Sequence, residues 1–176
     1  MKTERLRLRP LRSSDAETLH TIHEIVGHGR SRRTLEELRA LYREMEAMAD
    51  SDPGWHGFVI ELHDGTIIGD VGICTDRPEE RQAEIGYSLH PGYWRAGYAT
   101  EALTHLLDVM FSSRALHRVV AVTQADNVAS RALLERIGFR LEAYYRSAFY
   151  DYRAEAWVDS VGYALLAEDR STAISA

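Results

Sequence analysis

Apolar residues recur along the chain with two different periods, and the change of period marks the expected strands and helices. Over residues 82–89 apolar and polar positions alternate, which is the two-residue period of a strand. Over residues 99–110 the apolar positions follow a helical spacing instead. Pro91 and Gly92 stop the strand and begin a tight turn between the two segments. The rest of the chain is organised around this strand–turn–helix unit.

The same two periods predict the remaining elements. Strands are expected near residues 6–10, 55–62, 66–75, 117–123, 139–148 and 155–166. Two helices are expected to begin at Ser14 and Thr34, because each is followed three residues later by a glutamate, the spacing of a capping box. A further helix over residues 126–137 is expected to turn Ala129, Ala132, Leu133 and Ile137 toward the core.

Length and composition restrict the class of protein. A chain of 176 residues with 45% hydrophobic content predicts one globular domain, residues 1–176. The formal charge of -6 argues against general nucleic-acid binding and mildly favours a cationic partner such as an amine. Cys74 is the only cysteine, so no disulfide within the chain is expected, and a small strand side chain is favoured over a nucleophile. Without a signal-like or membrane-spanning run, we expect a cytoplasmic protein with no membrane partner.

The turn over residues 95–100 is a candidate phosphate site. A helix N-terminus carries unpaired N–H groups and a positive dipole end, and Gly97 and Ala99 would let a pyrophosphate approach the backbone. The alternative is that any strand–turn–helix unit needs a glycine. A P-loop is excluded because the only lysine is Lys2, and the glycines lack the dinucleotide-binding spacing. The single lysine also disfavours pyridoxal-phosphate chemistry.

Three histidines near the first expected helix suggest a zinc site at first sight. His23-Glu24 begins like the metalloprotease motif, but the position four residues after His23 is Gly27. His28 therefore lies off the face that His20 and His23 would share. We expect no metal.

Two segments carry a family resemblance. Gly97-Tyr98-Ala99 matches the second half of the acetyl-CoA-binding motif of GNAT N-acetyltransferases, with Trp94 where the family has Gln or Arg. The run Asn127-x-x-Ser-Arg-x-Leu-Leu-Glu-x-x-Gly-Phe139 resembles the second GNAT signature, although its Asn could simply cap a helix. Because both motifs occur in the family's order, the chain is identified as a member of the GNAT enzymes, most similar to the RimJ/RimL type.

The resemblance implies a fold. GNAT proteins have an α+β, three-layer architecture with a mixed, mostly antiparallel twisted sheet of about seven strands and helices on both faces. The sheet splays at its central strands, and the thioester enters the gap. Segment 157–166 also resembles RimJ/RimL-type proteins, whereas Ala143 stands where the family usually has Gly.

The resemblance also implies a site for acetyl-CoA as cosubstrate. The expected cofactor-binding residues are Ser88, Leu89, His90, Trp94, Arg95, Ala96, Gly97, Tyr98, Ala99, Thr100, Asn127 and Ser130. Backbone N–H groups near Leu89 would polarise the thioester carbonyl. The resemblance implies that Asn127 contacts the pantetheine arm of the cofactor and that Ser130 faces its sulfur.

Two groups are expected to be catalytic. Glu84 is the candidate base, directly or through water, unless it is only a strand-edge carboxylate paired with an arginine; Glu142 is the second candidate. Ser130 is the candidate acid or sulfur orienter. Many GNAT enzymes have a tyrosine four residues after this serine, but here that residue is Leu134, so the usual phenolic acid is missing.

The acceptor implied is a primary amine, either a protein or peptide N-terminus or a small molecule. The aromatic run 144–152 is explained in part by strand propensity, and a substrate wall or a homodimer contact is the sharper interpretation. A homodimer is the predicted assembly. Two alternatives stay open: a non-catalytic acyl-CoA-binding sensor, and an aminoglycoside or polyamine acetyltransferase.

Overall fold

The computed structural model describes residues 1–27, 33–75 and 80–173. These residues form a seven-stranded sheet in the order β1-β2-β3-β4-β5-β7-β6. The strands are β1 (Leu6–Pro10), β2 (Trp55–Leu62), β3 (Ile67–Cys74), β4 (Gln82–Leu89), β5 (Arg118–Gln124), β6 (Arg140–Asp151) and β7 (Ala156–Leu166). The helices are α1 (Ala16–Val26), α2 (Leu35–Ala47), α3 (Tyr98–Ser113), α4 (Val128–Arg136) and α5 (Ala167–Ala173), with short 3-10 helices η1 (Ser13–Asp15) and η3 (Pro91–Tyr93).

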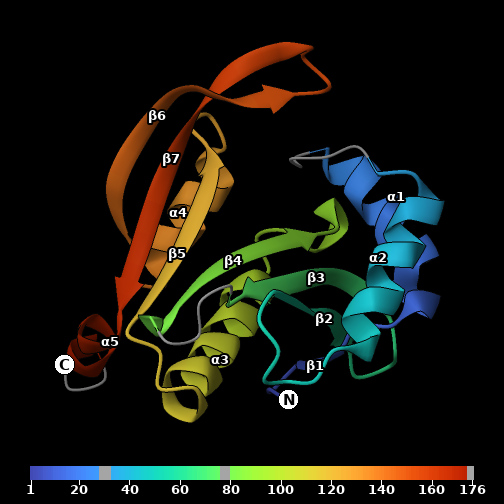
Figure 1. Cartoon of the computed structure of the whole chain (residues 1–176), viewed down its shortest axis with the longest axis horizontal. Helices are drawn as coiled ribbons and strands as arrows, with labels where there is room; N and C mark the ends of the chain where they lie inside the picture. Colours follow the sequence, from blue (N-terminus) through green and yellow to red (C-terminus); the bar gives the residue numbers. More distant parts are fainter. Residues whose placement is uncertain (28–32, 76–79, 174–176) are drawn as a thin grey trace.

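The sheet is mixed, as predicted. Its neighbouring strands pair antiparallel except β4 and β5, which run parallel. Helices α1 and α2 lie on one face, and α3 and α4 lie on the other (Figure 1). This confirms the expected α+β, three-layer GNAT architecture.

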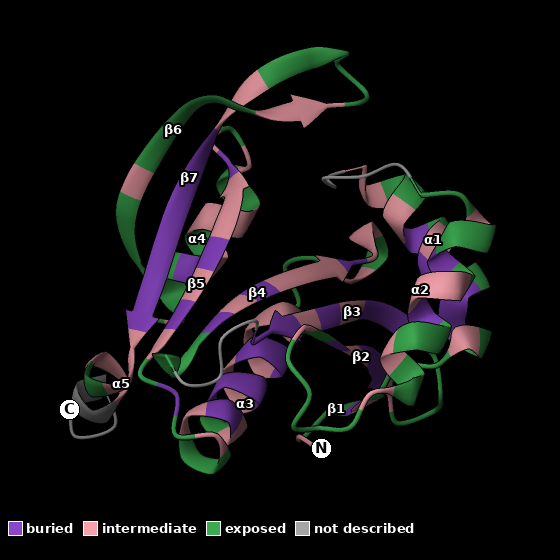
Figure 2. Ribbon diagram, viewed as in Figure 1, coloured by how far each residue is buried: buried purple, intermediate pink, exposed green. Residues whose placement is uncertain are grey.

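Two apolar clusters hold the layers together. The larger cluster joins α3, Leu134 of α4 and one face of the central strands. The smaller cluster packs α1 and α2 against Val59 of β2, whereas the adjacent Ile60 belongs to the larger cluster. Alternation along a strand therefore supplies both faces of the sheet with apolar side chains. Figure 2 shows buried residues along α3 and β7, while β6 is largely exposed.

Strand β4 follows the predicted alternation. Ala83, Ile85 and Leu89 are buried in the larger cluster, which turns the intervening Glu84, Gly86 and Ser88 toward the face that carries α1 and α2. Glycine is required at position 69 of the neighbouring β3, because a Cβ there would lie 2.2 Å from the Ser88 carbonyl oxygen.

Two local expectations for the helices need correction. Thr34 caps α2 as predicted, but Ser14 does not begin α1, since η1 precedes that helix and the Asp15 carboxylate accepts the Arg12 N–H at 2.8 Å. In α4 the fully buried residue is Leu134, whereas Ala129 and Ala132 are exposed. The helix turns this face inward because Leu134 fills the core behind β5 and β7.

Candidate functional site

The central feature of the site is the separation of β4 from β5. The two strands pair only through Gln82–Arg118, Ala83–Val119 and Glu84–Val120. Beyond Glu84, β4 stays paired with β3, and β5 stays paired with β7. The sheet is therefore split into two arms, one formed by β1 to β4 and the other by β5, β7 and β6. The arms diverge from the three β4–β5 pairs that end at Glu84, which we call the apex of the gap (Figure 1).

The exposed edge of β4 presents backbone donors to this gap. His90 donates its N–H to the Ile68 carbonyl of the β3 side at 2.8 Å. Because hydrogen-bonding direction alternates along an antiparallel strand, the N–H groups of Leu89 and Tyr87 point away from β3, into the gap. The Leu89 carbonyl oxygen accepts a hydrogen bond from the Trp94 indole at 2.6 Å. Trp94, at the motif's Gln/Arg position, thus closes the end of β4.

A strained turn leads from β4 to the N-terminus of α3. His90 caps η3 by accepting the Gly92 N–H, and Arg95 and Gly97 both have positive φ, 61° and 82°. Gly97 is the N-cap of α3 and supplies no side-chain acceptor. The first N–H groups of α3 therefore keep their hydrogen-bonding capacity at the positive end of the helix dipole. This geometry suits a pyrophosphate.

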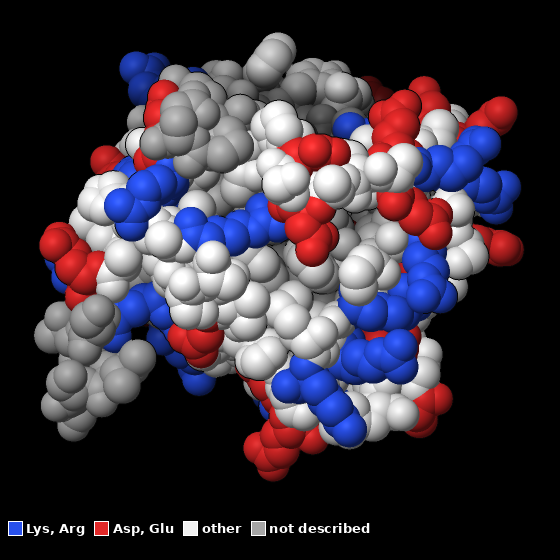
Figure 3. All heavy atoms as spheres, turned by 60° about the horizontal axis from the view of Figure 1, so that its bottom comes forward, with Lys and Arg blue, Asp and Glu red and all other residues white. Residues whose placement is uncertain are grey.

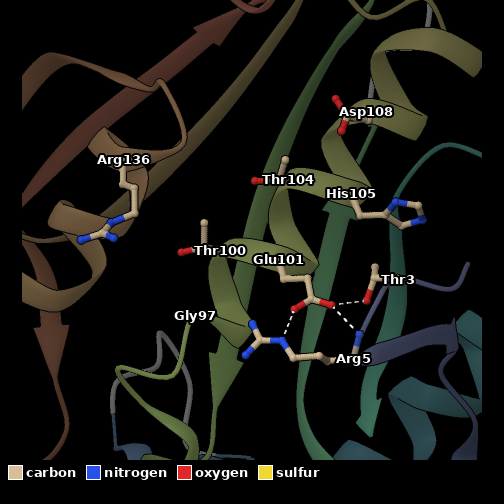
Figure 4. Close-up of a pocket in the computed structure, with 9 residues that line it drawn as sticks. All are labelled: Thr3, Arg5, Gly97, Thr100, Glu101, Thr104, His105, Asp108 and Arg136. Atoms are coloured by element: carbon tan, nitrogen blue, oxygen red, sulfur yellow. Dashed lines mark hydrogen bonds and ion pairs between the residues drawn. The ribbon is translucent and has the colours of Figure 1, made fainter. Parts of the chain in front are cut away.

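A pocket of about 540 Å³ lies beside this turn (Figure 4). Arg5, which precedes β1, donates to the Glu101 carboxylate at 2.7 Å and to the Ala96 carbonyl at 2.9 Å, and its guanidinium lies 4.5 Å from the Tyr98 ring centroid. Arg136, at the end of α4, lines the pocket on the side opposite Thr3 and Arg5. Sequence reasoning missed both arginines, because each is far along the chain from the motif it approaches.

Ser130 connects the second GNAT-like motif to strand β4. Its N–H is accepted by the Asn127 side chain at 3.1 Å, so Asn127 is the N-cap of α4. Its Oγ lies 2.7 Å from the Tyr87 hydroxyl across the gap. Burial raises the pKa of Tyr87 to about 12, although the hydrogen bond between Tyr87 and Ser130 opposes the shift. Tyr87 was missed because its position in the alternation marks it as a core residue.

A second pocket, of about 560 Å³, opens on the face of the sheet that carries α1 and α2. Glu84 lines it at the apex of the gap. Its walls include five aromatic residues of β6, β7 and the turn between them: Tyr145, Phe149, Tyr150, Tyr152 and Trp157. The aromatic run identified in the sequence therefore lies beside the candidate base.

The second candidate base has a different environment. Glu142 lies on β6 in a bidentate ion pair with Arg118, at the closed end of the gap. The hydrogen bond from Arg118 lowers the pKa of Glu142 below its usual range, which makes this carboxylate a weaker base.

The α1–β3 contact adds a polar cluster that no motif indicated. His23 Nε2 lies 2.8 Å from the Asp70 carboxylate, and Asp70 pairs across the strands with Ser88. Burial lowers the pKa of His23, but the hydrogen bond and charge of Asp70 outweigh it and hold this pKa above 6.5. The buried Ser88 Oγ has no hydrogen-bond partner in the described part of the chain.

The histidines considered for a metal have other contacts. His20 lies 3.2 Å from the Arg33 carbonyl, His23 pairs with Asp70, and His28 lies outside the described residues. Within residues 1–27, 33–75 and 80–173, no group of three or more metal-ligating side chains converges. Over the same residues, none of the helices is both long and apolar enough to cross a membrane.

Comparisons with known proteins agree with this geometry. The acetyltransferase (GNAT) domain family matches residues 5–140. The uncharacterized N-acetyltransferase YoaA of Bacillus subtilis (strain 168) is 28% identical over 155 residues, which cover 85% of this chain and 88% of YoaA.

Solved structures share the fold. Spermidine N-acetyltransferase from Vibrio cholerae, in complex with CoA and spermine, superposes with a TM-score of 0.82 at 22% identity, covering 95% of this chain and 98% of that one. Ribosomal-protein-S5-alanine acetyltransferase from Vibrio fischeri gives a TM-score of 0.82 at 24% identity, covering 96% and 97%. With the family match extending over most of its length, the chain belongs to the GNAT acetyltransferases.

Proposed function

We propose that the protein transfers the acetyl group of acetyl-CoA directly to a primary amine, with the two substrates meeting at the gap between β4 and β5. Membership of the family makes the chain an N-acetyltransferase with acetyl-CoA as donor. The observation that carries the proposal is the two-sided gap. One side leads to the N-terminus of α3, and the other leads to the aromatic pocket that contains Glu84.

The donor side fits coenzyme A in charge and shape. The turn over residues 95–100 offers backbone N–H groups to a pyrophosphate, and Gly97 leaves room beside Arg5. The strand edge at Tyr87 and Leu89 offers hydrogen bonds to a pantetheine arm and to a thioester carbonyl. We assign cofactor binding to this edge and turn, with Asn127 and Ser130 on the opposite side of the gap.

Three groups of this chain would serve the transfer. Glu84 accepts the proton of the ammonium, directly or through water, so that the neutral amine can attack the thioester carbonyl. The N–H groups of Leu89 and Tyr87 stabilise the negative charge that develops on the carbonyl oxygen. Ser130 orients the sulfur and donates a proton to the departing thiolate.

Tyr87 replaces the phenol that the second motif lacks. In this chain Leu134 occupies the position where a tyrosine is usual, and it is buried in the core. The Tyr87 hydroxyl reaches Ser130 from β4 instead, at 2.7 Å. With a pKa of about 12, Tyr87 stays protonated at neutral pH and can donate to Ser130 when Ser130 donates to sulfur.

Acetyl-CoA titration tests the donor site. We expect Gly97→Glu to abolish binding, since its carboxylate would lie where the pyrophosphate is held. Gly97→Ala is the matched control, because both variants place a side chain at a positive φ but only one adds charge. Calorimetry of wild type, Gly97→Ala and Gly97→Glu measures the three affinities. Absence of binding by the wild type would contradict the proposal.

A non-catalytic acyl-CoA sensor would bind the donor in the same way. Steady release of free coenzyme A in the presence of an amine distinguishes the enzyme from the sensor. Within the enzymes, we propose the RimJ/RimL type, with a protein N-terminus or a small amine as acceptor. The named neighbours act on a polyamine and on a ribosomal protein, so they support an amine acceptor of either kind.

We also propose that the protein is a cytoplasmic homodimer. Apolar side chains are exposed on the face of β6 that points away from the second pocket: Leu141 is 51% exposed and Tyr144 is 60% exposed. This surface supports a contact between two copies of the chain. Sedimentation of wild type and of Leu141→Glu measures whether that surface joins two chains.

A further inference from the structure

The second pocket, which contains Glu84 and which we call the acceptor pocket, is dominated by aromatic rings. Tyr150 makes edge-to-face contacts with Tyr152 and Trp157, with ring centroids 5.1 and 5.5 Å apart. Tyr145 and Phe149 extend the same wall along β6. Trp157 is 65% exposed, so its ring is not part of the hydrophobic core and leaves apolar surface available to a ligand in the pocket. Aromatic faces of this kind bind flat apolar groups and also attract a cation.

Charge in the pocket is confined to one place. Among the described residues that line it, Glu84 is the one with an ionisable carboxylate, and none is basic. The neighbouring Asp151 is committed to the hairpin: it accepts from Gln124 at 3.1 Å and from the Arg153 and Ala154 N–H groups. Asp159 lies on the opposite face, where it accepts from Tyr144 and from the Ser147 N–H.

We propose that the acceptor is a monocationic amine with an apolar, aromatic body: an arylalkylamine. This inference rests on the proposed transferase function and names the substrate class for the same pocket. The single ammonium would lie at Glu84, and the ring would lie against Tyr150 and Trp157.

Competing acceptors fit the lining less well. A polyamine would bring further positive charges against a wall whose described residues include no carboxylate besides Glu84, and an unpaired cation is costly to desolvate. A peptide terminus would bring several backbone amide groups, each needing a partner. Besides Glu84, the described lining side chains offer it the tyrosine hydroxyls, the Trp157 indole N–H and Ser160, too few to pair several amide groups.

The hairpin that carries the wall is held in place. Arg153, in the turn after β6, donates to the Glu24 carbonyl near the end of α1 at 2.5 Å. Gly27 ends that helix, and a Cβ there would lie 2.0 Å from the Arg153 guanidinium carbon. These contacts tie the aromatic wall to the opposite arm, so the pocket has a defined shape for discriminating acceptors.

Turnover of four amines at saturating acetyl-CoA tests the assignment. The panel is phenethylamine, hexylamine, spermidine and an alanyl tripeptide. We expect kcat/KM for phenethylamine to exceed that for spermidine and for the peptide by about tenfold or more, the scale of discrimination by apolar contacts. Preference for spermidine or the peptide would overturn the assignment while leaving the transferase function intact. Failure to acetylate all four, with acetyl-CoA still bound, would overturn both.

A pair of variants locates the specificity. Trp157→Ala should raise KM for phenethylamine by about tenfold while leaving KM for acetyl-CoA and for hexylamine nearly unchanged. Tyr144→Ala is the matched control, an equally exposed aromatic residue on the opposite face of the hairpin. Equal effects of the two variants, or equal loss for both amines, would contradict a ring-binding wall. Tyr150→Leu provides a second variant that keeps the apolar volume.

Discussion

At the scale of single residues, the pair Tyr87–Ser130 depends on two segments that the sequence separates by more than forty positions. Ser130 was predicted from its motif, and the structure brings it to the gap as expected. Tyr87 could not be identified in the same way, because tyrosine at an inward strand position usually indicates the core. Only the divergence of β4 from β5 exposes its hydroxyl to Ser130.

Ser130→Ala and Tyr87→Phe should each lower kcat by up to about 10²-fold, the lower end of the range for general acid catalysis, with acetyl-CoA affinity nearly unchanged. The double variant should lose little more than either single variant, since the two hydroxyls act as one hydrogen-bonded unit. Single-turnover kinetics measures all three. If Ser130→Ala keeps full turnover but binds acetyl-CoA more weakly, Ser130 is only a cofactor contact.

The two candidate bases can be separated by a matched substitution. Glu84→Gln should reduce kcat/KM by about 10²-fold or more, because Glu84 lines the acceptor pocket. Glu142→Gln should change it little, because Glu142 is engaged by Arg118 and the pKa of its carboxylate is lowered. Rate profiles against pH for both variants provide the measurement. The reverse order of effects would assign the base to Glu142.

At the scale of elements, local signals predicted most boundaries. The strand β2 and the cap of α2 were predicted correctly, since Thr34 and Glu37 satisfy each other's backbone N–H groups. The start of α1 was wrong because Asp15, held by Arg9 at 2.7 Å, accepts the Arg12 N–H and begins η1 instead. The inner face of α4 was only partly correct: Leu133 and Ile137 pack against the larger cluster as predicted, but contacts distant in sequence bury Leu134 in place of Ala129 and Ala132.

The attachment of α1 to β3 should depend on pH through His23. Asp70 raises the folded-state pKa of His23 above its ordinary value of 6.5. The charged pair therefore stabilises the fold fully at pH values below 6.5, where His23 would be protonated in both the folded and the unfolded chain. The stabilisation is lost as pH rises through the raised folded-state pKa. We expect the difference in Tm between wild type and His23→Gln to be largest near about pH 5.5 and to shrink by about pH 9.

Thermal unfolding across this range checks the sign. Two neighbouring groups would not cause a difference in Tm that shrinks as the pH rises. The charge of Arg33 opposes the protonation of His23, and burial raises the pKa of Tyr42 above its ordinary value. A difference in Tm that grows with pH would contradict the assignment to His23.

At the scale of the whole molecule, the two arms are joined at the apex and again at the tip of the hairpin. Figure 3 shows basic and acidic side chains interspersed over one face rather than gathered into fields of one sign. Pairs such as Arg5–Glu101 and Arg140–Asp169 compensate charge locally. This face therefore offers no broad field of one sign that would steer a charged acceptor over long distances.

Removing the contact at the hairpin tip should loosen the acceptor pocket alone. Arg153→Ala should raise KM for the amine severalfold, since one exposed charge-assisted hydrogen bond contributes about 1 kcal/mol, and leave KM for acetyl-CoA unchanged. Amide hydrogen exchange over residues 149–158 should become faster. Arg146→Ala, on the same hairpin, is the control. Equal exchange in both variants would show that the tip is held by other contacts.

The sequence by itself determined the order of the seven strands and of helices α1 to α4, because period, capping and glycine placement act over a few neighbouring residues. The α+β class followed from the resemblance of the two motifs to the GNAT family. The sequence also placed Glu84 and Ser130 on their elements. Only the tertiary structure decided that β4 and β5 separate after three pairs, that Arg5 reaches the α3 turn and that the aromatic hairpin folds beside Glu84. These features depend on contacts between segments that are far apart in the sequence, such as the packing of α1 and α2 on β2 and of α3 and α4 on the central strands.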